Sequence, residues 1–413
     1  MVTLRENIGL DDAATGTQTG TVGEPSVAVS RTGLFVTGNW FATRSSDAGA
    51  SWTFVDPFSA FAQDRGMFCC DQLALWVPKI RTWVWLLQYS RSGESNIVRI
   101  AVSRDAEAWR SWEVTPTSVD ATWTKAWFDY PDLAVSDGHL WVSSNQYSTD
   151  DRWLRAGVLR YPLDAIERFA AGRIDAVPRE NWSTREHGSL RFVVGAGDTM
   201  WWASNDAASR SLAVFAWPDT AGTVETWDVP VAAWDDTDYT SLGPGNSQWL
   251  SRCDDRVTGG WRTAGRAGQP ARLGWLWTAG RGADRPHPYI RAVTLAEADL
   301  RVVAQPDLWS PNGAWAYPAA APNARGRVGM TAFWGSSTEF PTHTVGVLDT
   351  SGIGWTTART AASTHPPQDG KWGDYLTVHP HPRRPTSWVA SGYTLQGGQD
   401  RRNIEPRVVC FRA

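Results

Sequence analysis

The chain has 413 residues, and its 39 Lys and Arg against 43 Asp and Glu leave a formal net charge of −4. This balance argues against a nucleic-acid-binding protein, the 42% hydrophobic share argues against a disordered chain, and no apolar run approaches the ~18 residues of a membrane-spanning helix. At roughly 150 residues per domain the length suits nearly three domains, although a closed all-β architecture can use it as one.

A short segment that reads as a strand recurs seven times, with copies beginning near residues 24, 69, 129, 189, 253, 316 and 373. Each copy is followed by a turn and a second strand, as in 33–40 and 82–89. Repeats about 45 to 64 residues apart, built from short strands and Gly-rich turns, are typical of propeller blades. The sequence therefore predicts an all-β fold: a single seven-bladed β-propeller domain over residues 1–413, with four-stranded antiparallel blades.

The two ends of the chain are expected to meet in the last blade. The unit that begins near residue 373 has room for only about three strands. We expect residues 2–10 to supply its outer strand, because a closed ring removes the exposed sheet edges of an open stack. Helical signal is minor, with two turns expected over residues 162–169.

One segment carries a family mark. Residues 45–52 read Ser-Ser-Asp-Ala-Gly-Ala-Ser-Trp, which fits the Asp-box pattern Ser-x-Asp-x-Gly-x-Ser/Thr-Trp, and looser copies span 103–109 and 349–355. The chain resembles the sialidase-like, Asp-box (BNR repeat) β-propeller group, and the resemblance implies a propeller and glycan chemistry. Sialidases of this group place a Phe/Tyr-Arg-Ile/Leu-Pro motif where residues 23–27 read Gly-Glu-Pro-Ser-Val. Only the Asp-box positions, which are structural, therefore carry over.

Blade topology predicts which face binds a ligand. In a propeller the inner strands begin on one face, and the turns between second and third strands return to it, so loops converge there on a rigid scaffold. Acids, histidines, tyrosines and one arginine that map to this face are the candidate catalytic residues: Asp71, Asp132, Arg191, His187, His287, His343, Tyr317, Asp374 and Tyr375. Amides and aromatic residues on the same face are the candidate substrate-binding residues: Trp40, Gln88, Trp127, Tyr130, Asn145, Asn205, Trp334, Trp372 and Tyr393. Such residues suit a sugar, since amides and acids bind hydroxyls and aromatic rings cover the C–H face of a pyranose.

Three functions fit this set. A glycoside hydrolase would use two carboxylates, one protonated and one ionised, with Tyr317 or Tyr375 as nucleophile or stabiliser. Its carboxylate candidates are Asp71, Asp132, Asp254 and Asp374. A polysaccharide lyase performing β-elimination on a uronic-acid glycan would need a His or Tyr base and an arginine such as Arg191 to neutralise the carboxylate. A lectin would repeat one pocket in several blades, whereas these opening segments differ from blade to blade. We therefore expect a hydrolase acting on an acidic or complex glycan, with the lyase and the lectin as alternatives.

The cysteines and the partners complete the expectations. A bridge between the neighbours Cys69 and Cys70 requires a strained ring, so buried free thiols are favoured and a vicinal disulfide is the alternative.

No cofactor is required by the sequence, and a divalent metal such as calcium in or near the central channel remains open. We expect a monomer that binds an oligo- or polysaccharide, with no nucleic-acid partner and no membrane insertion. No signal-peptide pattern opens the sequence. We expect an extracellular or periplasmic protein whose signal lies outside this sequence, and a cytoplasmic one is the alternative.

Overall fold

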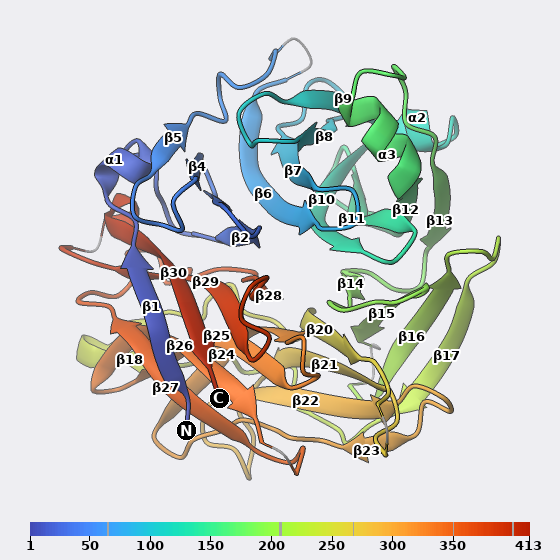
Figure 1. The fold of residues 1–413 in the computed structure, drawn as a ribbon. Coiled ribbons are helices and arrows are strands. Elements are labelled where there is room, and N and C mark those ends of the chain that lie inside the picture. The colour runs from blue at the N-terminus through green and yellow to red at the C-terminus, as the bar shows by residue number, and fades with distance from the viewer. Residues whose placement is uncertain (64–65, 206–208, 267, 350, 399) are drawn as a thin grey trace.

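The structure is a computed structural model of residues 1–413, which describes all of them except 64–65, 206–208, 267, 350 and 399. Seven four-stranded antiparallel sheets surround a common axis (Figure 1), and the predicted seven-bladed β-propeller is confirmed. No described helix is long and apolar enough to cross a membrane.

The blades follow one another along the chain, each written here from its inner to its outer strand. The first three are β2 (Ser26–Val29), β3 (Leu34–Gly38), β4 (Phe41–Ser45) and β5 (Thr53–Val55); β6 (Phe68–Val77), β7 (Thr82–Tyr89), β8 (Val98–Ser103) and β9 (Arg110–Val114); and β10 (Ala126–Val135), β11 (His139–Ser148), β12 (Trp153–Pro162) and β13 (Glu180–Thr184). The next three are β14 (Arg191–Phe192), β15 (Thr199–Asn205), β16 (Ser211–Pro218) and β17 (Glu225–Pro230); β20 (Val257–Thr263), β21 (Arg272–Ala279), β22 (Tyr289–Ala296) and β23 (Val302–Ala304); and β24 (Gly313–Pro322), β25 (Val328–Ser336), β26 (Glu339–Leu348) and β27 (Trp355–Ala362).

The seventh blade joins both ends of the chain. It consists of β28 (Val378–Pro380), β29 (Ser387–Leu395), β30 (Ile404–Arg412) and, outermost, β1 (Thr3–Gly9). β1 pairs antiparallel with β30, from Thr3 opposite Arg412 to Gly9 opposite Arg407. The ring is therefore closed by the N-terminal strand, as predicted.

Short elements occupy the connections. They are α1 (Asp12–Thr15), α2 (Pro116–Val119), α3 (Leu163–Ala170), the 3-10 turns η1 (Pro244–Asn246) and η2 (Arg401–Asn403), and the two-residue pair β18 (Leu242–Gly243) and β19 (Ser247–Gln248). The helix expected over 162–169 is α3, whose buried Leu163, Ile166 and Phe169 recur every three residues on one face.

Large aromatic side chains fill the space between blades. Trp388 of blade 7 is fully buried and its indole N–H donates to the Ala321 carbonyl of blade 6 at 2.9 Å. A Cβ on Gly329 of blade 6 would lie 2.6 Å from the Trp388 ring, so glycine makes room for this indole. Packing of this kind accounts for much of the tryptophan content.

Bulges in the first half or the middle of three inner strands shape the face where those strands begin, which we call the opening face. Tyr130 and Pro131 together oppose a single residue of β11, and Tyr317 and Pro318 oppose a single residue of β25. Both tyrosines have a left-handed backbone, with φ of 54° and 56°. In β6 three residues, 69–71, oppose Gln88 alone. Because a bulge redirects the side chains beside it, these sites decide what projects over the axis.

Candidate active site

Carboxylates from four blades gather at the opening face: Glu24, Asp71, Asp129 and Asp374. Asp71 is half-buried. Its pKa is raised to about 8, chiefly by burial and then by the nearby carboxylates of Asp129 and Asp374. Two arginines oppose this shift only in part. Asp71 is therefore a protonated acid at neutral pH.

The two arginines come from the segment that leads into blade 5. Arg252 donates to Asp374 from Nε at 3.1 Å and from its terminal nitrogen at 2.8 Å. Arg256 pairs with Asp254 at 2.7 Å, reaches Asp374 at 3.4 Å and places its guanidinium 4.5 Å from the centre of the Tyr130 ring. The Arg252 side chain stays 45% exposed although Asp374 is only 5% exposed. The mouth of the channel thus offers a cation to an anionic ligand, with Asp374 as its buried counter-ion.

Glu24 lies beneath this surface. It is 1% exposed and accepts a hydrogen bond from Asn39 at 3.0 Å. Burial, with the carboxylates of Asp374 and Asp71 nearby, raises the pKa of Glu24 well above its usual range. We therefore regard Glu24 as a neutral, buried group that shapes the cluster from below.

Blade 3 contributes a half-buried carboxylate and two rings. Gln88, predicted as a substrate-binding residue, donates to the Asp129 carboxylate at 2.9 Å. Trp127 and Tyr147 are half-buried, with ring centres 5.4 Å apart, and the Trp127 indole is oriented by a 3.0 Å bond to the Ser148 carbonyl. Burial and the nearby Asp129 carboxylate raise the pKa of Tyr147. The rings form an aromatic edge beside Asp129.

Four predicted site residues close the axis instead of facing the solvent. Arg191 pairs with Asp132 at 2.7 Å and donates to the Tyr130 hydroxyl at 3.1 Å. The Tyr375 ring meets Tyr130 edge-on at 6.0 Å between centres. All four side chains are buried, and the cavity along the axis measures only about 50 Å³. They form a plug beneath the carboxylate cluster.

The tyrosines predicted as nucleophiles are both deep in the fold. Tyr317 is 3% exposed and Tyr375 is 1% exposed. Burial raises the pKa of each well above the usual range. Neither phenol is ionised or accessible in this arrangement.

The predicted histidines do not converge. His343 lies inside β26 and not in a loop, is fully buried, and hydrogen-bonds Thr331 at 2.7 Å and Thr360 at 2.6 Å. Burial, with some contribution from Arg407, lowers the pKa of His343 to about 3, so it is neutral. His187 and His287 are half-buried, and among the described residues neither forms a hydrogen bond or ion pair with the carboxylate cluster.

The predicted amides mainly join blades. Asn145 accepts from the Ser189 backbone N–H at 2.8 Å and donates to its hydroxyl at 3.1 Å, which ties blade 3 to the start of blade 4. Asn205 donates to the Asp255 carbonyl and ties blade 4 to blade 5. Both amides therefore hold the connections between blades in place around the mouth of the channel.

The predicted aromatic residues lie in different surroundings, some buried and some half-buried. Trp372 and Tyr393 are buried and stacked, with ring centres 4.9 Å apart, and the Tyr393 hydroxyl donates to the Trp372 carbonyl. Trp334 is half-buried under the Arg359 guanidinium at 4.6 Å. Trp40 is half-buried against Gly20. Trp127 lies on the Asp129 side of the carboxylate cluster, in the ring pair that it forms with Tyr147.

Sequence reasoning missed four residues of the cluster: Asp129, Tyr147, Arg252 and Arg256. Asp129 immediately precedes the Tyr-Pro-Asp segment that marks blade 3, and Arg256 lies within the repeat that opens blade 5. Counting every polar residue within three positions of each repeat would have found three of them. Tyr147 lies at the end of the second strand, two positions beyond the predicted Asn145.

The expectation for the adjacent cysteines was wrong. Cys69 and Cys70 form a disulfide, while Cys253 and Cys410 are free and buried. The bulge at 69–71 takes these residues out of the regular ladder. A bulge relaxes the extended backbone that would otherwise hold neighbouring side chains on opposite faces of the sheet.

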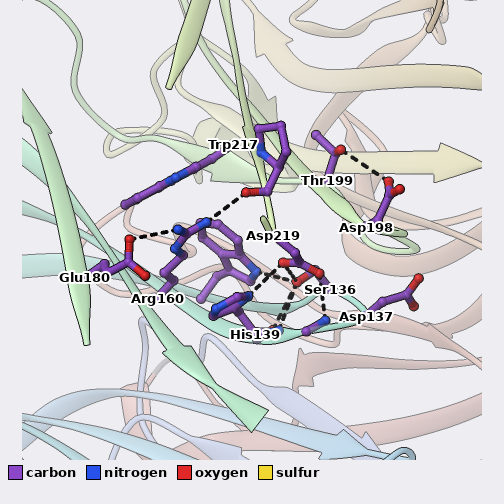
Figure 2. A network of polar contacts seen from close by, with 12 residues as sticks. Ser136, Asp137, His139, Arg160, Glu180, Asp198, Thr199, Trp217 and Asp219 are labelled. Atoms are coloured by element: carbon purple, nitrogen blue, oxygen red, sulfur yellow. Dashed lines mark hydrogen bonds and ion pairs between the residues drawn. The ribbon is translucent and has the colours of Figure 1, made fainter. Parts of the chain in front are cut away.

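The opposite face carries a Ser, His and Asp cluster that is structural. Asp219 of blade 4 accepts hydrogen bonds from the Ser136 hydroxyl at 2.6 Å and the His139 ring at 2.8 Å (Figure 2), and a third from the Gly138 N–H at 2.7 Å. The serine hydroxyl donates to the aspartate directly and not to a histidine ring nitrogen, so the order of a catalytic triad is absent. In the described part of the chain, no group of three His, Cys, Asp or Glu residues could hold a metal ion.

Two larger hollows flank the axis. One of about 480 Å³ opens on the opposite face, lined by Trp76, Lys79 and His379 among others. The other, about 340 Å³, lies by the turn between the second and third strands of blade 5, and its lining includes Trp234 and Arg285. Trp234 donates to Asp255 at 2.9 Å, which links this hollow to the segment that carries Arg252 and Arg256. No residue of the carboxylate cluster lines this second hollow, and the Trp234–Asp255 bond is what links it to the Arg252–Arg256 segment.

Comparison with known proteins gives structural similarities and no family. Neither a family model nor a curated protein matches the sequence. Among solved structures the chain is similar to the α-L-arabinofuranosidase Arb93A from Fusarium graminearum, with a TM-score of 0.47 and 11% identity, covering 99% of this chain and 98% of that one. It is also similar to the Hadza microbial sialidase Hz136, with a TM-score of 0.47 and 12% identity, covering 86% of this chain and 68% of that one. A third similar structure is the hemagglutinin-neuraminidase of parainfluenza virus 5, with a TM-score of 0.45 and 12% identity, covering 87% of this chain and 94% of that one. These similar structures include a sialidase and a neuraminidase, and no family is assigned to this chain.

The state of Asp71 predicts how stability varies with pH. In the unfolded chain its pKa is about 3.9, whereas in the fold it is about 8. Between about pH 4 and pH 8 the unfolded state has released this proton and the folded state keeps it, so rising pH favours unfolding. We expect Asp71→Asn to raise the melting temperature relative to the parent, by more at pH 8 than at pH 5. Parallel melting curves across this range would contradict the assignment.

Proposed function

We propose that this chain hydrolyses glycosidic bonds of an acidic or complex glycan at the opening face. The observation that carries the proposal is a protonated, half-buried carboxyl, Asp71, beside a second half-buried carboxylate, Asp129, at an aromatic edge. A glycosidase needs this asymmetry: one acid protonates the leaving oxygen while the other carboxylate activates water or attacks the sugar. Asp71 is assigned as the acid and Asp129 as its partner.

The surroundings support a charged and extended substrate. Arg252 remains 45% exposed despite its ion pair, so it can meet a carboxylate or sulfate on the glycan. Trp127 and Tyr147 offer ring faces to a sugar. The hollow of about 340 Å³ at blade 5, linked to the Arg252–Arg256 segment by the Trp234–Asp255 bond, gives room for a further sugar unit.

The alternatives are less well supported by the same residues. A lyase base drawn from His343 or Tyr317 would have to act from the buried interior, and Arg191 is occupied by Asp132. A lectin would not require a carboxyl whose pKa is raised to about 8.

A panel of neutral, uronic-acid and sulfated polysaccharides tests the proposal. We expect new reducing ends without unsaturated products. Unsaturated products, read by ultraviolet absorbance, would establish the lyase instead. Binding with neither product would establish the lectin.

Trp127→Ala should weaken substrate binding more than turnover. Loss of one stacking ring is worth about 0.5–1.5 kcal/mol, so we expect KM to rise about 2- to 12-fold with little change in kcat. Trp227→Ala is the matched control, because this tryptophan of outer strand β17 stacks on Trp201, away from the cluster. Equal effects of the two substitutions on KM would contradict a substrate contact at Trp127.

A further inference from the structure

The Cys69–Cys70 disulfide adjoins the assigned acid in the chain. The bridge joins consecutive residues and is followed at once by Asp71. Both cysteines are half-buried, and the neighbouring Met67 is 61% exposed. A small reductant can therefore reach this part of the opening face, unlike the buried thiols of Cys253 and Cys410.

The same three residues form the bulge of β6. Phe68 pairs with Tyr89 and Gln72 pairs with Leu87, so residues 69–71 face only Gln88. Gln88 in turn holds the Asp129 carboxylate at 2.9 Å. The bulge thus carries one carboxyl of the proposed reaction, Asp71, and lies opposite Gln88, which holds the other, Asp129.

Both ends of the bulge are anchored. The Phe68 N–H donates to Gln63 at 2.7 Å, and the Phe68 ring packs edge-on against Phe58 at 5.0 Å. Gln72 is fully buried, donates to the Gly38 and Phe41 carbonyls at 2.8 and 3.0 Å, and accepts from the Trp85 indole at 2.8 Å. Conformational freedom in this strand is therefore confined to residues 69–71, outside the ladder. The disulfide joins two of these three residues and therefore restricts most of their remaining conformational freedom.

We propose that the Cys69–Cys70 disulfide positions the Asp71 carboxyl over the channel mouth, and that reduction of this disulfide by a dithiol reversibly releases the carboxyl from that position. The proposal rests on the role of Asp71 in the proposed function. A thiolate of the dithiol attacks one cysteine sulfur and breaks the S–S bond. The second thiol of the dithiol then attacks the mixed disulfide and releases the bound cysteine. The protein thereby gains two hydrogens and the dithiol becomes its cyclic disulfide. Residues 69–71 regain backbone freedom, and Asp71 loses its single orientation.

Dithiothreitol is the probe. Intact-mass and peptide mapping without reductant should find Cys69 bonded to Cys70, and treatment should add two hydrogens there. Carbon NMR of the Asp71 side chain should show its pKa falling toward the ordinary range on reduction, because a mobile carboxyl is more solvated. Turnover should fall about 10- to 100-fold, as expected for a misplaced catalytic group, and recover on reoxidation.

Two variants complete the test. Cys69→Ser with Cys70→Ser should reproduce the reduced protein and no longer respond to dithiothreitol. Cys410→Ser removes a buried thiol of β30 and should keep the full response. If the double variant does not fold, the Asp71 titration and the turnover of the oxidised and the reduced parent protein still test the proposal.

Two outcomes would overturn the proposal. They are free thiols at both positions in protein purified without reductant, or an Asp71 titration that is the same in both redox states. The NMR readout needs no turnover, so it separates this proposal from the proposed function. A redox-dependent titration without any glycan cleavage would reject the hydrolase and retain the positioning role.

Discussion

Asp71→Asn should lower kcat for glycan hydrolysis about 10²- to 10⁴-fold while the protein stays folded. Asparagine keeps the size of the side chain and cannot donate a proton to the leaving oxygen. The wild-type carboxyl holds its proton at neutral pH because burial and the carboxylates of Asp129 and Asp374 disfavour its charge. The loss is therefore expected in the chemical step, with KM changed little.

The leaving group distinguishes this mechanism from general damage. An aryl glycoside with an acidic phenol needs little protonation, so Asp71→Asn should retain far more activity on it than on a natural glycan. Asp299→Asn, an exposed aspartate in the turn between β22 and β23, serves as the control and should match the parent. A natural-glycan rate within a few-fold of the parent in Asp71→Asn would remove this residue from the role of acid.

Asp219→Ala should destabilise the propeller by about 3 kcal/mol without involving the opening face. This carboxylate, whose side chain is 9% exposed, accepts from three donors of the neighbouring blade, as Figure 2 shows. Its loss leaves buried donors without an acceptor at the junction of blades 3 and 4. Since a chain of this length has a large unfolding entropy, we expect the melting temperature to fall by about 3–5 °C.

Asp198→Ala is the matched control for that effect. Asp198 is drawn in the same network, yet it is exposed, and among the described residues its side chain accepts only from the neighbouring Thr199 at 3.2 Å. It should change the melting temperature by less than about 1 °C. Equal shifts for Asp198→Ala and Asp219→Ala would show that the junction does not depend on the buried carboxylate. Retained activity in folded Asp219→Ala would agree with a structural role for the Ser136, His139 and Asp219 cluster.

The sequence by itself determined the architecture of this protein. Seven strand repeats, an incomplete last unit and a strand-like N-terminus predicted the closed seven-bladed ring, because strand periodicity and turn residues are local properties of the chain. The repeats also located the face on which Asp71, Asp374 and Gln88 lie. The same locality explains why the helix over 162–169 was found.

Only the tertiary structure decided which of those residues meet a ligand. Tyr317, Tyr375 and His343 looked equivalent to Asp71 in the repeat pattern, yet they are buried, because neighbouring blades cover their side chains. Arg252 gains its role from Asp374, which lies 122 positions further along the chain. Burial and ion pairing depend on contacts between blades that are distant in sequence, and a local pattern cannot report them. The Cys69–Cys70 bridge was missed for the same reason, since its geometry follows from a bulge fixed by residues of two blades.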